Sequence, residues 1–292
     1  MAQRSHVSNR IYVIEALSPG ELRTGTDLFE NEFAQRTQHN REFHAALART
    51  DTKAEFSAAL THAEQECRER GWQPMLHIDA HGSVEGLGFP SGEFMPWGEM
   101  KEAITAINVA SRNNLVVVLA ACMGIHLISI IGTHDRAAAF AIISTAIEVE
   151  AGDVAVSFRA FYNEMFRTRD GAAALQRLND ALPGAPPRYG IVHSETMFLD
   201  AFQHYVDTRL SPEEVVRRME RLERDSRGSR AMHAGEIQAR RESITRALVD
   251  GLQPEFEKAR DHFFMVDLEP ANRERFPVSF DQINMPLAFL GL

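Results

Sequence analysis

A histidine and a cysteine each follow a predicted buried strand, and together they could form a catalytic pair. His81 comes just after the apolar segment 74–79. Cys122 comes just after the continuous apolar run 115–120, which is typical of a parallel strand buried on both faces. A helix expected over 97–110 would connect the two strands as parallel neighbours. Because loops at the carboxyl ends of such strands meet at one edge of the sheet, we expect the thiol and the imidazole to face each other there.

This pair would suit acyl transfer through a thiolate. A free cysteine has a pKa near about 8.5, so it needs a neighbouring base to be deprotonated at neutral pH. A helix expected to start at Met123 and Gly124 would add the positive end of its dipole. The backbone N–H groups of Gly82 and Cys122 are the expected donors for the oxyanion hole. Glycine at position 82 would also permit an unusual backbone angle and the close approach of a substrate carbonyl.

Two further side chains precede His81 on the same strand and alternate to the same face. Asp79 could orient the imidazole or shape the first substrate subsite. His77 lies inside the strand, where a hydrogen-bonded core histidine is the more usual role. With Cys122 and His126 these side chains also offer zinc-type ligands, so a zinc-binding hydrolase is one alternative. The sequence has neither a two-cysteine knuckle nor a His-Glu-x-x-His helix, and we expect no metal and no cofactor.

The order of the predicted elements indicates an α/β fold over the first two thirds of the chain. Apolar runs predict strands at 11–17, 42–46, 74–79, 115–120, 138–144 and 189–193, with a small hairpin over 87–95. Helical spacing predicts helices at 26–38, 52–70, 97–110, 154–167 and 171–182. This alternation requires crossover connections, so we expect a mainly parallel sheet with helices on its faces.

The remainder of the chain has a different pattern. A proline and a capping box start a helix at 211–214, and a second helix follows after the polar segment 223–236. We expect that segment to be an exposed loop, and it could serve in self-cleavage or regulation. The sequence therefore predicts an α/β domain over 1–205 and a helical extension over 206–292.

Composition narrows the classes of protein that fit. Of the 292 residues, 44% are hydrophobic and 25% are charged, which is ordinary for a globular protein. The net charge of −10 disfavours a nucleic-acid partner held by phosphate neutralisation, and no phosphate-binding Gly-x-x-x-x-Gly-Lys loop occurs. Two cysteines exclude a disulfide framework. The longest nearly apolar run, 137–147, is shorter than the roughly 20 residues that cross a bilayer, and no signal peptide is evident. We expect a cytoplasmic protein without a membrane partner.

The two strand ends resemble motifs of a known family. The segment Leu76–Gly82 is similar to the strand and His-Gly motif of caspase-like cysteine peptidases. Val116–Gly124 is similar to their strand and Ala-Cys-x-Gly motif. The hairpin over 87–95, the helix opening at 97 and the segment Phe158–Met165 fit the CHAT branch, which is related to separase. The resemblance covers about residues 10–195. It implies a caspase-like α/β/α sandwich in which the cysteine of the second motif is the nucleophile and the histidine of the first is the base.

The resemblance also implies a biological setting. Peptidases of this kind cut one or a few protein partners and are switched on by an activating partner or signal. In bacteria they accompany antiviral defence systems and can activate gasdermin-like pore formers. Ala120 stands where caspases carry glutamine and metacaspases an acidic residue, so no preference for the residue before the scissile bond is predicted. A catalytically inert caspase-like binding module is the other alternative.

Overall fold

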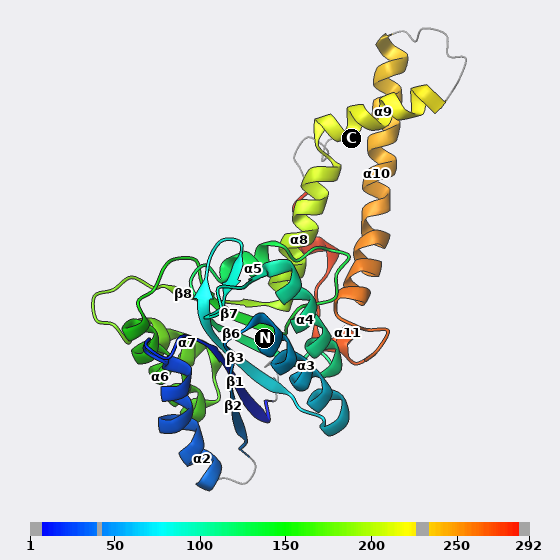
Figure 1. The fold of residues 1–292 in the computed structure, drawn as a ribbon. Coiled ribbons are helices and arrows are strands. Elements are labelled where there is room, and N and C mark those ends of the chain that lie inside the picture. The colour runs from blue at the N-terminus through cyan, green and yellow to red at the C-terminus, as the bar shows by residue number, and fades with distance from the viewer. Residues whose placement is uncertain (1–7, 40–42, 226–233, 286–292) are drawn as a thin grey trace. The chain divides into compact units, whose positions relative to one another are not determined.

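The structure is a computed structural model, and it describes residues 8–39, 43–225 and 234–285 (Figure 1). The chain divides into two compact units. The first contains Met1–Ile131 and Arg136–Ser194, and the second contains Gly132–Asp135 and Glu195–Leu292. The boundary expected between 205 and 206 falls inside helix α8 (Ser194–Arg209), which lies almost wholly in the second unit.

A mostly parallel sheet forms the centre of the first unit, as the alternating pattern predicted. Its strands run in the order β2-β1-β3-β6-β7-β8. In the sequence they are β1 (Arg10–Ala16), β2 (Ala45–Arg49), β3 (Pro74–Gly82), β6 (Val116–Ala120), β7 (Ala141–Thr145) and β8 (Tyr189–His193). Only β8 is antiparallel to its neighbour within this path. The predicted hairpin is formed by β4 (Gly86–Gly88) and β5 (Phe94–Pro96). β4 pairs antiparallel with the last residues of β3.

Helices cover both faces of this sheet, which confirms the α/β architecture (Figure 1). One face carries α3 (Lys53–Arg70) and α4 (Trp97–Ala110), which pack against each other. The other carries α1 (Thr24–Leu28), the π-helical turn η1 (Phe29–Phe33), α2 (Ala34–His39), α6 (Ala151–Thr168) and α7 (Gly171–Asp180). The central strands are almost wholly buried, because side chains on both faces meet a helix layer.

Local sequence signals account for where α3 begins and ends. The Thr52 side chain accepts a hydrogen bond from the Glu55 N–H, and the Glu55 carboxylate in turn accepts one from the Thr52 N–H. Such a capping box satisfies two amide donors that a helix leaves unpaired, and loss of its N-cap side chain typically costs about 1 kcal/mol. Gly71 ends the helix in the left-handed conformation, with φ of 65°.

Two strands begin three residues later than predicted. The strand predicted at 42–46 is β2, which starts at Ala45, and residues 40–42 lie outside the described part of the chain. It is the edge strand and is only half-buried, so its sequence carries a weak apolar signal. The strand predicted from 138 begins at Ala141, because residues 137–139 are buried without pairing in the sheet.

The second unit is helical, as expected for the end of the chain. Besides α8 it contains α9 (Pro212–Asp225), α10 (Ala234–Phe263), α11 (Asn272–Arg275) and the 3-10 turn η2 (Phe280–Gln282). Its core is rich in phenylalanine, with Phe198, Phe202, Phe256, Phe263 and Phe264 buried and in mutual ring contact. The ends of the segment 223–236, predicted as a loop, are helical: α9 includes residues up to Asp225 and α10 begins at Ala234. Residues 226–233 lie outside the described residues, so the proposed self-cleavage there stays a prediction.

Across the described residues, we find no helix whose length and apolar character would let it cross a membrane.

Candidate active site

The register of β3 against β6 places His81, near the end of β3, beside the turn after β6 that contains Cys122. Asp79 of β3 is paired with Ala120 of β6. Each candidate residue lies two positions beyond its member of that pair. The carboxyl ends of β1 and β7 lie on either side, because the strand order is β1-β3-β6-β7. The loops that follow all four parallel strands therefore border the same edge of the sheet.

Gly82 packs directly on the backbone of Cys122. A Cβ atom built on Gly82 would lie 2.0 Å from the carbonyl oxygen of Cys122 and 3.1 Å from its amide nitrogen. Gly82 does not adopt a positive φ. Glycine is therefore required at this position for space and not for an unusual backbone angle. The sequence predicts the close approach of a substrate carbonyl to Gly82. In the structure, the carbonyl group of Cys122 occupies that space.

Cys122 lies at a sharp turn and is half-buried. Met123, the next residue, has a left-handed φ of 57°, which is costly for a residue other than glycine. The helix expected to start at Met123 and Gly124 begins at Ile125 and is only five residues long (α5, Ile125–Ser129). A helix this short supplies little of the dipole that the sequence suggested. The donor aimed at the sulfur is instead the Val149 N–H, 3.4 Å from Sγ, in the loop after β7.

His81 is exposed and hydrogen-bonds to a residue that the sequence reasoning missed. Its Nε2 atom lies 2.8 Å from Oε1 of Glu21, in the loop after β1. The other carboxylate oxygen of Glu21 accepts the Ser18 N–H at 2.7 Å. These contacts keep the pKa of Glu21 below its ordinary value, chiefly through the Ser18 amide and then through His81. No spacing rule links positions 21 and 81, so only the fold reveals this pair.

The thiol and the imidazole do not hydrogen-bond to each other in the part of the chain that the structure describes. His81 is bound on the β1 side by Glu21, and Cys122 on the β7 side by Val149. Long or unformed catalytic hydrogen bonds are common in enzymes without substrate. The thiol and the imidazole therefore lie at the same edge of the sheet without a hydrogen bond between them.

Asp79 is buried and caps the helix that begins at Thr24. Its Oδ2 accepts hydrogen bonds from the Thr24 hydroxyl at 2.5 Å and from the Gly25 N–H at 2.6 Å. Burial raises the pKa of Asp79 to about 7, although the hydrogen bonds from Thr24 and Gly25 act in the opposite direction. The negative charge of Glu15 raises the pKa further, and the positive charge of a protonated His81 lowers it. The hydrogen bonds of Asp79 thus run to the helix and not to the imidazole.

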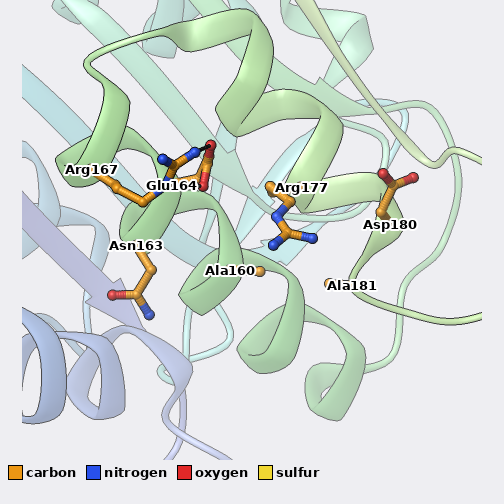
Figure 2. Close-up of a pocket in the computed structure, with 7 residues that line it drawn as sticks. All are labelled: Ala160, Asn163, Glu164, Arg167, Arg177, Asp180 and Ala181. Carbon is orange, nitrogen blue, oxygen red and sulfur yellow. Dashed lines mark hydrogen bonds and ion pairs between the residues drawn. The ribbon is translucent and has the colours of Figure 1, made fainter.

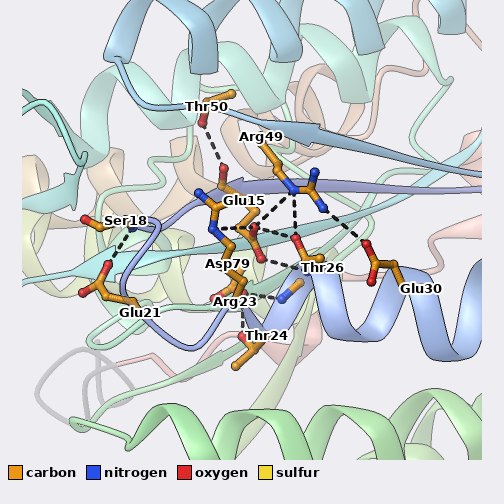
Figure 3. A network of polar contacts seen from close by, with 11 residues as sticks. Glu15, Ser18, Glu21, Arg23, Thr24, Thr26, Glu30, Arg49, Thr50 and Asp79 are labelled. Carbon is orange, nitrogen blue, oxygen red and sulfur yellow. Dashed lines mark hydrogen bonds and ion pairs between the residues drawn. The ribbon is translucent and has the colours of Figure 1, made fainter.

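Glu15 lies directly opposite Asp79 on β1 and is 1% exposed (Figure 3). It accepts hydrogen bonds from the N–H and the hydroxyl of Thr26, at 2.8 and 2.7 Å. The guanidinium groups of Arg23 and Arg49 each approach it to 3.9 Å. The two buried carboxylates therefore hold the first residues of α1, and with them the end of the loop that carries Glu21.

His77 lies in the core. It is fully buried, its Nδ1 is 3.0 Å from the Tyr162 hydroxyl, and its ring packs edge-on against Phe158. Burial lowers the pKa of His77 to about 3, so the ring is neutral. No group of three or more His, Cys, Asp or Glu side chains that could hold a metal ion occurs among the described residues. The ligand set considered for zinc is accordingly not gathered there.

A hollow of about 410 Å³ lies between α6 and α7 and contains none of the residues at the sheet edge (Figure 2). Its rim is polar, and Arg167 there is paired with Glu164. The lining residues are Ala160, Asn163, Glu164, Arg167, Arg177, Asp180 and Ala181.

No protein-family model matches the chain, and a search among curated proteins finds no significant match.

Proposed function

We propose that this protein is a cysteine endopeptidase in which Cys122 is the nucleophile and His81 the general base and acid. The observation that carries the proposal is the correspondence of the two residues at the ends of β3 and β6, with Gly82 in backbone contact with Cys122. A thiol and an imidazole at the carboxyl ends of adjacent parallel strands lie where α/β folds place their sites. The sequence resemblance to the CHAT branch of caspase-like peptidases points the same way.

The proposed reaction has two steps. Sγ of Cys122 attacks the scissile carbonyl carbon, a C–S bond forms, and the thiol proton passes to His81. His81 then gives this proton to the leaving amine as the C–N bond breaks. Water, deprotonated by His81, hydrolyses the thioester and releases the acid and the free thiol. The amides of Gly82 and Cys122 are the proposed oxyanion donors, and no cofactor is needed.

Local features support the role of Cys122. The Val149 N–H is directed at Sγ, 3.4 Å away, so the sulfur lies beside a backbone donor at the sheet edge and is not packed only among apolar groups. The left-handed Met123 turns the chain sharply after the cysteine, as the residues around a nucleophile do in other α/β hydrolases. Cys67, in contrast, is buried in α3 and belongs to the core.

The biological setting is proposed from the resemblance alone. The substrate would be a specific protein, cut after activation by a partner protein, in the cytoplasm. A gasdermin-like pore former in a bacterial antiviral defence system is the proposed substrate. Co-expression with such a protein checks this part separately, because the wild-type enzyme would cleave it and Cys122→Ala would not.

Profiling against a peptide library tests the proposed activity. We expect the wild-type protein to cleave a restricted set of peptides, and Cys122→Ala and His81→Ala to cleave none. Cys67→Ala is the matched control, because it removes the other thiol and should leave cleavage intact. Cleavage that persists in Cys122→Ala would refute the proposal, as would no cleavage by the wild type when its activating partner is present.

A catalytically inert binding module is the second candidate, and one observation favours it. His81 and Cys122 are each hydrogen-bonded to a flanking loop instead of to one another. For an inert module, peptide profiling would give no Cys122-dependent product under any condition. Replacement of His81 would then leave the reactivity of the Cys122 thiol unchanged.

A further inference from the structure

We propose that Glu21 is a positioning residue that holds His81 for proton exchange with Cys122. This inference rests on the proposed function and adds a third member to the pair. Neither the spacing of the sequence nor the motifs pointed to this carboxylate. It is assigned by its contact with the imidazole and by the way its loop is anchored.

The strand order places His81 between the other two residues. Glu21 follows β1, His81 is the penultimate residue of β3, and Cys122 follows β6, and β3 is the middle strand of the three. The loop that carries the carboxylate and the turn that carries the thiol therefore lie on opposite sides of β3. In a nucleophile–histidine–acid arrangement the acid binds one ring nitrogen and the nucleophile uses the other. Here Nε2 is the nitrogen bound to the acid, which leaves Nδ1 for the thiol proton.

The carboxylate of Glu21 is held in place by its own loop. The Glu21 N–H donates to the Ser18 carbonyl at 3.0 Å, and the Ser18 N–H donates back to Oε2 at 2.7 Å. Of the two carboxylate oxygens of Glu21, these hydrogen bonds with Ser18 occupy only Oε2 and leave Oε1 to bind His81. Figure 3 shows Ser18 and Glu21 at this turn, beside the buried carboxylate network.

Both ends of the loop are anchored in the core. Leu17, before the turn, is buried. Thr24 and Gly25, after it, are bound by the buried Asp79. A hydrogen bond between a carboxylate on a mobile loop and an exposed imidazole contributes little free energy, because the entropy lost in ordering the two side chains offsets their attraction. Anchoring reduces that entropic cost, so the Glu21–His81 contact can orient a ring whose side chain is 67% exposed.

The charge of Glu21 determines what the contact does. Its low pKa keeps the carboxylate ionised at neutral pH, so it can only accept a hydrogen bond. His81 must then carry a proton on Nε2, which sets the ring orientation and makes Nδ1 the basic atom of the neutral ring. The same carboxylate stabilises the imidazolium formed when the thiol proton is taken up.

Glu21→Ala tests the inference, with Glu85→Gln as the matched control. Glu85 is an exposed carboxylate close to His81 in the sequence, and it hydrogen-bonds to Ser83 instead of to the imidazole. On a peptide selected by library profiling, we expect Glu21→Ala to lower kcat by about 10- to 100-fold, within the range of proton-transfer contributions. KM should stay unchanged, since Glu21 is proposed to act through His81 and not through binding of the substrate. Glu85→Gln should match the wild type in both.

An NMR measurement keeps the test independent of cleavage. The wild-type protein and Glu85→Gln should show a hydrogen-bonded Nε2–H resonance of His81, and Glu21→Ala should lose it. Persistence of that resonance in Glu21→Ala, or an unchanged or increased kcat, would overturn the inference; an increase would mean that Glu21 restrains His81. If no protein, the wild type included, cleaves any peptide in the presence of the activating partner, the proposed function fails, and the resonance still decides whether Glu21 orients the ring.

Discussion

The carbonyl oxygen of Cys122 occupies the space that a side chain at Gly82 would need, at 2.0 Å from the position of its Cβ atom. Because both partners in this contact are backbone, neither can move aside as a flexible side chain would. The His-Gly and Ala-Cys-x-Gly segments are therefore coupled through main-chain packing. The contact ties the geometry of one half of the proposed pair to that of the other.

Gly82→Ala should consequently displace Cys122. We expect an overpacking cost of about 1–3 kcal/mol in the free energy of unfolding and a loss of peptide cleavage. Urea unfolding and cleavage assays measure the two effects. Gly190→Ala in β8 is the matched control, because its Cβ would meet nothing within 4 Å, and it should retain both stability and cleavage. Wild-type stability and cleavage in Gly82→Ala would contradict the close packing.

The two cysteines should differ in reactivity. Burial raises the pKa of Cys67 to about 12, and the nearby charges of Glu64 and Glu66 add to this. Cys67 therefore stays a buried thiol, while Cys122 is half-buried at the sheet edge. We expect iodoacetamide to alkylate Cys122 in the folded protein and Cys67 only after unfolding. Peptide mapping by mass spectrometry reads this directly, and equal labelling of both residues in the folded protein would contradict it.

The buried Asp79 should make stability depend on pH. Its pKa is raised from 3.8 to about 7, so the unfolded chain releases this proton at lower pH than the native protein does. The contribution of Asp79 to the free energy of unfolding is therefore fully present below about pH 4 and is lost as the pH rises through about 7. The shift corresponds to a loss on the order of 4 kcal/mol.

Asp79→Asn should flatten this dependence, since asparagine keeps a carbonyl acceptor for Thr24 and Gly25 but does not titrate. Urea unfolding at a series of pH values compares the two proteins. Glu69→Gln removes an exposed carboxylate from α3 and should keep the wild-type profile. If Asp79→Asn were to follow the wild-type profile instead, Asp79 would not be the titrating group.

Much of the first unit could be predicted from the sequence because its elements carry strong local signals. The capping box of Thr52 and Glu55 predicts the start of α3, and Gly71 predicts its end. The apolar run of β6 can only belong to a strand covered on both faces. The antiparallel direction of β8 has no such signal, since a short strand reads the same in either direction.

The pairs across strands could not be predicted, because they depend on register. Glu15 and Asp79 are adjacent only once β1 and β3 pair, and a single sequence does not specify that alignment. Glu21 belongs to no motif in the sequence. Its contact with His81 spans 60 positions and depends on where the loop folds back. The motifs in the sequence were therefore enough to predict the candidate residues His81 and Cys122. The residues that hydrogen-bond to them could be identified only from the fold.

Covalent labelling with a peptidyl acyloxymethyl ketone is the most direct test of whether His81 and Cys122 act as one unit. The reagent needs a thiolate and a nearby proton donor, as peptide cleavage does. We predict a single adduct on Cys122 in the wild-type protein, found by intact mass and peptide mapping, and none on His81→Ala or Cys122→Ala. Labelling of His81→Ala at the wild-type rate would contradict the proposed pair.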